Sequence, residues 1–535
     1  MCIVAYKPLQ IFQQRGYKVF YYVEWLIGNR RNSFIGRLFM LTFIAFAGMA
    51  VLNIPVHRFT TIPYLSLLGI LFYVGITALF CLIVFSQKTK IPLKFTPRIK
   101  RQYVVIFILS TFLTFFLLWI GSVVIGSWLF FSLIAFTPFL LPYVIILTKY
   151  ILWPLEFVIR LYYINKAKTK LADPTYDNLI RIGITGSYGK TTCKNILAAM
   201  LSQKFSVAAS PASFNTPMGF AKTVNEVLAP EHEIMVFEMG LRYKRDIKTL
   251  AELFKPQHGI LTAIGSQHIE TMGSIEAIKA EKSELVNAVP QGGIVILNGD
   301  SEKCVEVFNE SSHENKHLSK VLSTCRGKLP GCTGNYFATA TDIKVTKDGC
   351  TFKMNLGSES INCTTKLLGI HSVENILMCA TMAFKLGVTK EQIANAISTM
   401  DAVPHRLELI EAPTGVLILD DSYNASEQGT RAALKVLELF DGKKIVQTPG
   451  IVEQGKQAYT TNFNYAKEIA GIADAVIVVN EINRQAILDG LASSDFDKEK
   501  IHTVKNLEEA KALYATLLSS GDVLLIANDL PDSFT

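Results

Sequence analysis

The pattern of hydrophobic and polar positions divides this chain of 535 residues into two parts of different physical class. The first part, residues 1–170, holds four long apolar stretches, each near or above the roughly 20 residues that a helix needs to cross a membrane. The expected spans are Ile35–Val56, Pro63–Phe85, Tyr103–Leu129 and Phe130–Leu147. Because a secretory signal would give a single short apolar run, we predict an α-helical membrane region with four spans.

From about residue 171 onward, short apolar runs alternate with helical segments, which is typical of parallel α/β sheets. We predict a central α/β domain over residues 171–402, with a small antiparallel insertion at about 301–365. A second, Rossmann-like α/β domain is predicted over residues 403–535. The expected strands are Leu179–Thr185, Glu233–Met239, His258–Ile264 and Gly293–Leu297 in the first domain, and Val416–Asp421, Lys444–Gln447, Ala475–Asn480 and Val523–Ala527 in the second.

The distribution of charge agrees with a membrane region at the start of the chain. Residues 1–170 contain 18 Lys and Arg side chains against two acidic ones, whereas the rest of the chain has 35 basic and 43 acidic side chains. The basic side chains gather before the first span, between the second and third, and after the fourth. The positive-inside rule then predicts a multi-pass protein of the cell membrane with its α/β domains in the cytoplasm. We expect membrane lipids as partners and no nucleic acid.

Two smaller features add to this view. Leu9–Leu26 mixes aromatic and basic residues and is expected to lie along the membrane surface as an amphipathic helix, the alternative being an ordinary solvated leader. The nine cysteines include no Cys-x-x-Cys pair, so a structural zinc ribbon is not predicted.

The most informative run is Gly-Ile-Thr-Gly-Ser-Tyr-Gly-Lys-Thr-Thr at residues 183–192, between a predicted strand and a predicted helix. Glycines in this context let backbone N–H groups surround phosphate oxygens at the positive end of the helix. Lys190 can reach the β- and γ-phosphates, and the hydroxyl of Thr191 can bind Mg²⁺. A glycine-rich turn without a ligand is the alternative, but it gives no reason for the Lys-Thr pair. The predicted nucleotide contacts here are Gly186, Ser187, Gly189, Lys190, Thr191 and Thr192.

Three further side chains are candidate site residues. Two of them lie at or just after predicted strand ends, where α/β sheets build their sites. Glu238 ends a strand, and a carboxylate there can complete a Mg²⁺ shell. His268 follows the next strand; taken alone, it is most simply a solvated or capping residue. Lys282 lies in Lys-Ala-Glu-Lys-Ser-Glu-Leu, which by itself indicates a solvated helix face.

A series of motifs follows in order after residue 178. They are Thr-Gly-Ser-x-Gly-Lys-Thr-Thr (185–192), Phe-Asn-Thr-Pro-Met-Gly (214–219), Phe-Glu-Met-Gly (237–240), Gln-His-Ile-Glu-Thr-Met-Gly-Ser (267–274), Glu-Lys-Ser-Glu (281–284), Leu-Asn-Gly-Asp (297–300), Gly-Ile-His-Ser-Val-Glu-Asn (369–375), Pro-His-Arg-Leu-Glu (404–408) and Asp-Asp-Ser-Tyr-Asn-Ala (420–425). This ordered set resembles the Mur ligase family over about residues 178–535. Glu-Met-Gly and Asp-Asp-Ser-Tyr-Asn-Ala most resemble the branch that adds D-alanyl-D-alanine to a muramyl tripeptide (MurF).

The resemblance implies an ATP-dependent ligase of peptidoglycan synthesis that forms an amide bond through an acyl phosphate and releases ADP. A carboxylate and a γ-phosphate are both anions, so positive charge is needed between them. Lys190, with Mg²⁺ held by Thr191, Glu238 and His268, would supply it. The family's lysine that matches Lys282 is carbamylated and binds a second Mg²⁺. The implied catalytic residues are therefore Lys190, Glu238, His268 and Lys282.

The resemblance also assigns residues to the substrates. The implied nucleotide contacts outside the glycine-rich run are Asn375 to the adenine, Arg406 to the phosphates and Asp420 to the ribose. The implied substrate contacts are Asn215 and Thr216, which match substrate-side positions of the family, and Tyr423 and Asn424, which would position the incoming amine. Because the C-terminal domain must close over the nucleotide, we expect loop and hinge motion.

The chain departs from the family pattern at both ends. Membrane spans stand where soluble members have a UDP-binding domain, which indicates a lipid-linked muramyl acceptor. Asn-Ala-Ser-Glu at 424–427 and Ile-Ala-Asn-Asp-Leu-Pro-Asp at 526–532 replace the branch's Asn-Ala-Asn-Pro and Lys-Gly-Ser-Arg-like runs. Since both lie in the domain that handles the amine, an amine other than D-alanyl-D-alanine stays open.

Two alternatives to the interpretation as a MurF-like ligase remain. One keeps the chemistry in a poly-γ-glutamate-type synthetase or in an amidating ligase acting on lipid-linked muramyl peptide, although amidating relatives carry a Cys-x-x-Cys ribbon. The other is an ATP-driven transporter or a non-catalytic membrane scaffold. A transporter needs ionisable residues inside its spans, and the four stretches hold only Arg37 near the start of the first. A scaffold has no need for the predicted catalytic residues, so we favour the ligase.

Overall fold

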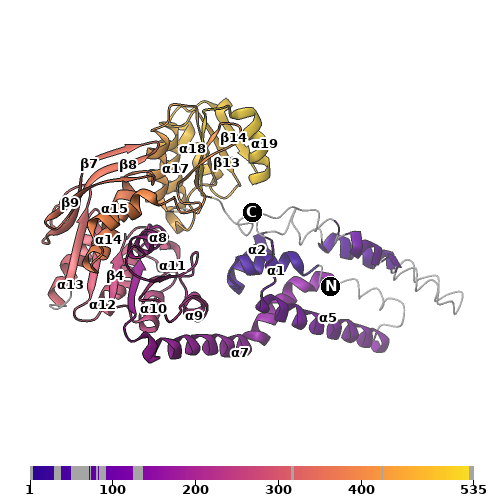
Figure 1. Ribbon diagram of the computed structural model, residues 1–535. Coiled ribbons are helices and arrows are strands. Elements are labelled where there is room, and N and C mark those ends of the chain that lie inside the picture. The colour runs from indigo at the N-terminus through magenta and orange to yellow at the C-terminus, as the bar shows by residue number, and fades with distance from the viewer. Residues whose placement is uncertain are drawn as a thin grey trace, which may run out of the picture. The chain divides into compact units, whose positions relative to one another are not determined.

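The computed structural model describes residues 4–28, 38–49, 71–72, 74–79, 82, 92–124, 137–314, 319–423 and 426–528. The chain divides into two compact units (Figure 1). The first unit comprises Met1–Arg160 and Leu530–Thr535, and the second comprises Leu161–Asp529.

The described part of the first unit is helical. Its helices include α1 (Tyr6–Gln14), α2 (Val19–Gly28), α5 (Pro97–Val124) and most of α7 (Thr137–Leu171), which continues into the second unit. Gly16 and Tyr17, between α1 and α2, have φ angles of 62° and 60°. A left-handed backbone cannot continue an α-helix, so the predicted single helix over Leu9–Leu26 is wrong.

Among the described residues, one helix is long and apolar enough to cross a membrane, over Pro97–Leu117 of α5. It overlaps the third predicted span. Leu38–Met49, inside the first predicted span, is a shorter apolar helix. Most of the second span, and residues 130–136 of the fourth, lie outside the described residues. The number of spans therefore stays a prediction.

The second unit begins with the end of α7, which packs on helix α9 (Pro217–Glu226) and on the loop after it. Ile164 and Ala167 of α7 are buried in the same core cluster as Phe220 and Val224 of α9. The ammonium of Lys170 donates to the carbonyl that follows α9, at residue 228, over 2.6 Å. The last turns of α7 and helix α9 therefore form one rigid packing unit.

The described central domain is built on a sheet with the strand order β2-β3-β1-β4-β5-β6-β7-β8-β9. The strand bounds are β1 Ile180–Thr185, β2 Val207–Ala209, β3 Ile234–Glu238, β4 His258–Leu261, β5 Ile294–Asn298, β6 Ser319–Thr324, β7 Tyr336–Thr346, β8 Gly349–Leu356 and β9 Glu359–Thr365. Neighbours from β2 to β7 pair in parallel, whereas β8 is antiparallel to both β7 and β9.

The segment predicted as an insertion at about 301–365 extends the main sheet instead of forming a separate one. It begins with helix α13 (Glu302–Glu314), and β6 then pairs in parallel with β5. The polar alternation from Asp342 to Leu356 that indicated antiparallel structure falls on β7 and β8, which form that arrangement. Alternation reveals one solvated face of a strand; it does not reveal which sheet the strand joins.

Helices cover both faces of the central sheet. On one face lie α8 (Lys190–Leu201), α14 (Ile370–Lys385) and α15 (Lys390–Thr399), packed on Ile182 and Ile184 of β1. The helices on the other face are α9, α10 (Asp246–Phe254), α12 (Ile275–Ala288) and α13, and the short α11 (Ile269–Met272) precedes α12. The loop after β1 leaves the sheet at its carboxyl edge, between the helices of the two faces. Sheets of this kind bind ligands at that edge.

The C-terminal domain has a second sheet with the order β10-β11-β15-β12-β13-β14 in the described residues. Its elements are β10 Glu408–Glu411, β11 Leu417–Asp421, α16 Glu427–Leu437, β12 Lys444–Thr448, α17 Ala458–Ala470, β13 Ala475–Val479, α18 Arg484–Ala492, β14 Ile501–Val504, α19 Leu507–Leu517 and β15 Val523–Ala527. Only β10 runs antiparallel to its neighbour among these strands. The two predicted α/β domains are confirmed.

Candidate active site

The glycine-rich loop joins β1 to α8, and close contacts require its glycines. Gly186 has a φ of 157°, and Gly189, just before the helix, has a φ of 79°. A Cβ atom at Gly186 would lie 1.9 Å from Oγ1 of Thr262, and one at Gly189 would lie 2.7 Å from Oδ1 of Asn375. Larger residues would therefore displace the loop from the helix N-terminus, the position at which backbone N–H groups bind anions.

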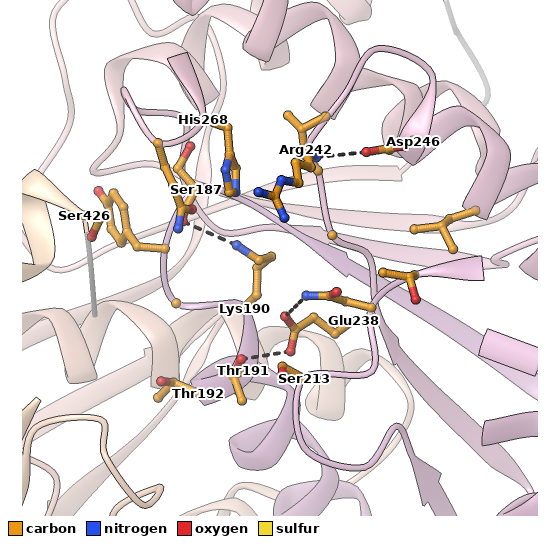
Figure 2. A pocket seen from close by; sticks show the side chains of 18 of the residues that line it. Ser187, Lys190, Thr191, Thr192, Ser213, Glu238, Arg242, Asp246, His268 and Ser426 are labelled. Atoms are coloured by element: carbon orange, nitrogen blue, oxygen red, sulfur yellow. Dashed lines mark hydrogen bonds between the residues drawn. The ribbon is translucent and has the colours of Figure 1, made fainter. Parts of the chain in front are cut away.

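The side chain of Lys190 folds back over this loop. Its ammonium donates to the carbonyl of Gly186 at 2.6 Å and to that of Ser187 at 3.3 Å (Figure 2). Burial lowers the pKa of Lys190 to about 8; the Glu238 carboxylate opposes this change and the Arg406 guanidinium reinforces it. A poorly solvated cation beside the loop favours an anion, so a phosphate group in the loop would gain this ammonium as a partner.

Glu238 lies at the end of β3 and is 1% exposed. Its Oε2 atom accepts a hydrogen bond from the hydroxyl of Thr191 at 2.8 Å, and its Oε1 atom accepts one from the amide of Asn215 at 3.0 Å (Figure 2). The ammonium of Lys194 lies 3.9 Å from Oε2. A hydroxyl beside a buried carboxylate is the kind of oxygen donor set that Mg²⁺ prefers, so these residues fit the predicted metal.

Lys282 is buried on α12 and is 1% exposed, so the interpretation of its segment as a solvated helix face is wrong. Burial lowers its pKa well below the usual value for a lysine, and the positive charge of Lys190 acts in the same direction. Sequence alone could not show this, because the charged neighbours in Glu-Lys-Ser-Glu resemble those of a surface helix. The environment therefore favours the uncharged amine over the charged ammonium.

His268 precedes α11 with a φ of 65°. Its Nδ1 atom lies 2.8 Å from Oε2 of Glu453, which comes from the C-terminal domain. The hydrogen bond with His268 lowers the pKa of Glu453, while burial acts in the opposite direction. The pair therefore links the loop after β4 to the C-terminal domain. Glu453 could not be recognised from the sequence, because its role depends on a contact between segments almost 200 residues apart.

Three further predicted nucleotide and amine residues, Asn375, Asp420 and Tyr423, contact other side chains of the second unit. Oδ1 of Asn375, on α14, accepts a hydrogen bond from the thiol of Cys193 at 3.2 Å. Oδ2 of Asp420 lies 2.7 Å from Nδ1 of His405, whose ring contacts the ring of Tyr423 with centroids 4.5 Å apart. These contacts place Asn375 against the glycine-rich loop and Tyr423 beside Asp420 at the end of β11.

A cavity of about 360 Å³ brings many of the predicted residues together. Those that line it are Ser187, Gly189, Lys190, Thr191, Thr192, Asn215, Thr216, Glu238, His268 and Arg406. Gly186, Lys282, Asn375, Asp420 and Tyr423 are not part of this lining, and Asn424 lies outside the described residues. The cavity therefore joins the nucleotide loop to the predicted substrate contacts Asn215 and Thr216.

Sequence reasoning missed several residues of the cavity wall. Arg242, Asp246 and Ser426 line it, and the backbone N–H of Arg242 donates to Oδ2 of Asp246 at 2.9 Å (Figure 2). Arg242 and Asp246 lie a few positions after the Phe-Glu-Met-Gly motif. Their closeness to that motif in the sequence was the available signal. The buried Lys194, one turn after Lys190, was also missed.

Comparison with known families agrees with this geometry. Residues 184–383 match the Mur ligase middle domain, and residues 405–528 match the Mur ligase glutamate ligase domain. Together the matches cover more than half of the chain. The chain belongs to the Mur ligase family. It is therefore a ligase that forms amide bonds with hydrolysis of ATP to ADP.

Individual Mur ligases resemble the chain over the same region. UDP-N-acetylmuramoyl-tripeptide--D-alanyl-D-alanine ligase of Escherichia coli is 27% identical over 342 residues, which are 64% of this chain and 73% of that enzyme. The Bacillus subtilis enzyme of the same name is 28% identical over 354 residues, 64% of this chain and 72% of that enzyme.

Solved structures show the same fold. MurF from Acinetobacter baumannii superposes with a TM-score of 0.60 at 22% identity, covering 69% of this chain and 77% of that one. MurF ligase from Thermotoga maritima, solved in complex with ADP, has a TM-score of 0.58 at 24% identity and covers 69% and 80%.

Proposed function

We propose that this Mur ligase is a membrane-anchored, MurF-like enzyme of cell-envelope synthesis. It would activate the carboxylate of a muramyl peptide as an acyl phosphate and join it to D-alanyl-D-alanine or a related amine. The observation that carries the proposal is the cavity in which Lys190 and the Thr191–Glu238 pair face the predicted substrate contacts Asn215 and Thr216, which we assign to the acceptor. The resemblance to D-alanyl-D-alanine ligases supports the choice of branch.

The residues of the cavity have separate tasks in this scheme. Lys190 and Arg406 bind and orient the phosphates, and their charge offsets the repulsion between phosphate and carboxylate. Asn215 holds Glu238 in place while it faces the acceptor. The contact between His268 and Glu453 keeps the C-terminal domain over the cavity and limits the entry of water.

The proposed function also includes two Mg²⁺ sites. Thr191 and Glu238 would hold one Mg²⁺ ion, with His268 on the same cavity, and the ion would neutralise charge between the two reacting anions. Lys282 would serve a second ion after carbamylation. Because burial favours the uncharged form of this lysine over the charged one, the amine nitrogen can attack CO₂, forming an N–C bond and releasing a proton to give an anionic carbamate.

Membrane anchoring rests on the first unit. Outward-facing side chains of α5 are apolar and exposed, among them Phe112 at 70% and Phe115 at 65%. An exposed apolar surface of this kind is typical of contact with lipid. We propose that all four predicted spans cross the cell membrane and that the acceptor is lipid-linked. The packing of α7 against α9 supports this, because α9 begins at Pro217, directly after Asn215 and Thr216, which we assign to the acceptor.

Phosphate release by the detergent-purified protein tests the proposed function. The amines D-alanyl-D-alanine, L-glutamate and ammonia would each be combined with UDP-linked and with lipid-linked muramyl tripeptide, and Lys190→Ala is the control. Release that requires D-alanyl-D-alanine and the lipid-linked acceptor would support the proposal. Release with L-glutamate or ammonia, but not with D-alanyl-D-alanine, would assign the enzyme to another branch of the family. Release with the UDP-linked acceptor, but not with the lipid-linked one, would refute the lipid-linked substrate.

A further inference from the structure

Lys194 is a buried cation to which the proposed mechanism gives no task. It lies on α8 one turn after Lys190 and is 1% exposed. Its ammonium donates to the carbonyl of Ala212 and lies 3.9 Å from Oε2 of Glu238, whose side chain is equally buried. Burying a charge is costly unless it is paired, so these two contacts define what Lys194 does in the fold.

The segment from Ser210 to Thr216, here called the acceptor loop, connects β2 to α9 and reaches the end of β3 at both of its ends. The backbone N–H of Glu238 donates to Oγ of Ser210 at 3.3 Å. At the other end, the amide of Asn215 donates to Oε1 of Glu238 at 3.0 Å. Lys194 holds the middle of the loop through the carbonyl of Ala212.

The middle of the acceptor loop is strained. Ala212 has a φ of 43° although it carries a Cβ atom, and its side chain is exposed. Such a left-handed conformation is disfavoured for residues other than glycine and persists only where neighbouring groups enforce it. No side-chain packing of Ala212 can do so at an exposed site, whereas the hydrogen bond from Lys194 to its carbonyl can.

We propose that Lys194 is a positioning residue that locks the acceptor loop onto Glu238 and thereby sets the affinity for the acceptor substrate. The inference rests on the proposed function in one respect, the assignment of Asn215 and Thr216 to the acceptor. Because the same ammonium faces Glu238, a correctly placed loop and a correctly placed carboxylate depend on one side chain. Lys194 thus connects the acceptor side of the cavity to its metal side.

Hydrogen exchange of the full-length, detergent-purified protein tests the lock without any substrate. The amide of Phe214 donates to the carbonyl of Pro211 inside the acceptor loop at 3.0 Å and serves as the probe. We expect Lys194→Met to speed its exchange about tenfold or more while the amides of α8 keep their protection. The matched control is Lys204→Met, since Lys204 also donates to a backbone carbonyl, that of Gly387 at 2.8 Å, away from the cavity.

Steady-state kinetics adds a readout that a merely structural lysine would not move. Lys194→Met should raise KM for the muramyl acceptor about tenfold and leave KM for ATP within about twofold. Ala212→Gly, added to Lys194→Met, should lower the acceptor KM again, because glycine adopts this φ without strain. If Lys194→Met does not fold, Ala212→Val tests the lock from the exposed side: a β-branched residue at this φ should raise the acceptor KM too.

Unchanged exchange at Phe214 in Lys194→Met would overturn the proposal. So would an equal loss of protection in α8, which would assign Lys194 to general stability. If the parent enzyme turns over none of the muramyl acceptors, the proposed function fails, while the exchange experiment still decides whether Lys194 holds the loop.

Discussion

The hydroxyl of Thr191 donates to Oε2 of Glu238 at 2.8 Å and so joins the first turn of α8 to the end of β3. The two residues are 47 positions apart in the sequence. They meet because β1 and β3 are adjacent parallel strands whose carboxyl ends share one edge of the sheet. This contact puts a phosphate-binding loop and a buried carboxylate side by side, which is the arrangement that a metal-assisted phosphoryl transfer requires.

Replacing the carboxylate of Glu238 should slow the reaction without weakening the binding of the nucleotide. Glu238→Gln keeps the volume but removes the negative charge: its amide oxygen can accept the hydrogen bond from Asn215, and its NH₂ group can donate to the hydroxyl of Thr191 instead of accepting from it. We expect phosphate release to fall by about 100-fold or more, with the binding of ADP in the absence of Mg²⁺ within about threefold of the parent. Calorimetric titration of ADP with and without Mg²⁺ measures this, and a variant that keeps its Mg²⁺ response would contradict the assigned role.

The buried ammonium of Lys190 should make stability depend on pH. Its pKa is about 8 in the folded protein and about 10.4 in an unfolded chain. Between these values the unfolded state binds more protons, so this lysine makes stability rise with pH. Lys190→Met should therefore be more stable than the parent at about pH 7, and the difference should shrink from about pH 8 to about pH 10. Thermal unfolding at several pH values measures it; a difference independent of pH would rule out this explanation.

Gly186 should tolerate no side chain. A Cβ atom there would lie 1.9 Å from Oγ1 of Thr262 and 2.9 Å from the backbone nitrogen of Ala263. We expect Gly186→Ala to weaken binding of a fluorescent ATP analogue by about tenfold or more, and Thr262→Gly should not restore it, because the backbone contact remains. Gly471→Ala is the control, since its nearest contact would be at 3.7 Å. Full binding by Gly186→Ala would show that the loop does not hold the phosphates.

The contact between His268 and Glu453 should contribute fully to stability above about pH 4.3 and less as the pH falls below that value. The hydrogen bond from His268 lowers the pKa of Glu453 below its unfolded value, which is about 4.3. Its contribution is therefore present above about pH 4.3 and lost as pH falls through the folded pKa. Glu453→Gln should lower the melting temperature at about pH 6 more than at about pH 3.5. The exposed Glu499→Gln is the control, and an equal effect at both pH values would contradict the assignment.

The parts of the site that local sequence determines could be predicted. Lys190 and Thr191 follow two glycines between a strand and a helix, and Glu238 ends an apolar strand; both signals lie within about ten residues. Most of the parallel strands of the two sheets were predicted from short apolar runs for the same reason. Shorter or more polar strands, such as Val207–Ala209 and Ser319–Thr324, were missed because neither contains an apolar run long enough to indicate a strand.

The parts that depend on tertiary contact could not be predicted. Lys282 looks like a surface residue among charged neighbours, yet α12 buries it. Glu453 acquires a role only through His268, and Lys194 only through Ala212 and Glu238. In each case the deciding neighbour comes from another element, so periodicity and spacing within one segment carry no information about it.

Oxygen transfer from acceptor to phosphate tests the central claim most directly. A muramyl tripeptide carrying ¹⁸O in its terminal carboxylate would be incubated with ATP, Mg²⁺ and D-alanyl-D-alanine, and the products examined by mass spectrometry. Activation as an acyl phosphate predicts ADP, an amide product, and inorganic phosphate that carries one ¹⁸O atom from the carboxylate. Phosphate free of ¹⁸O, or the release of AMP and pyrophosphate, would contradict the account.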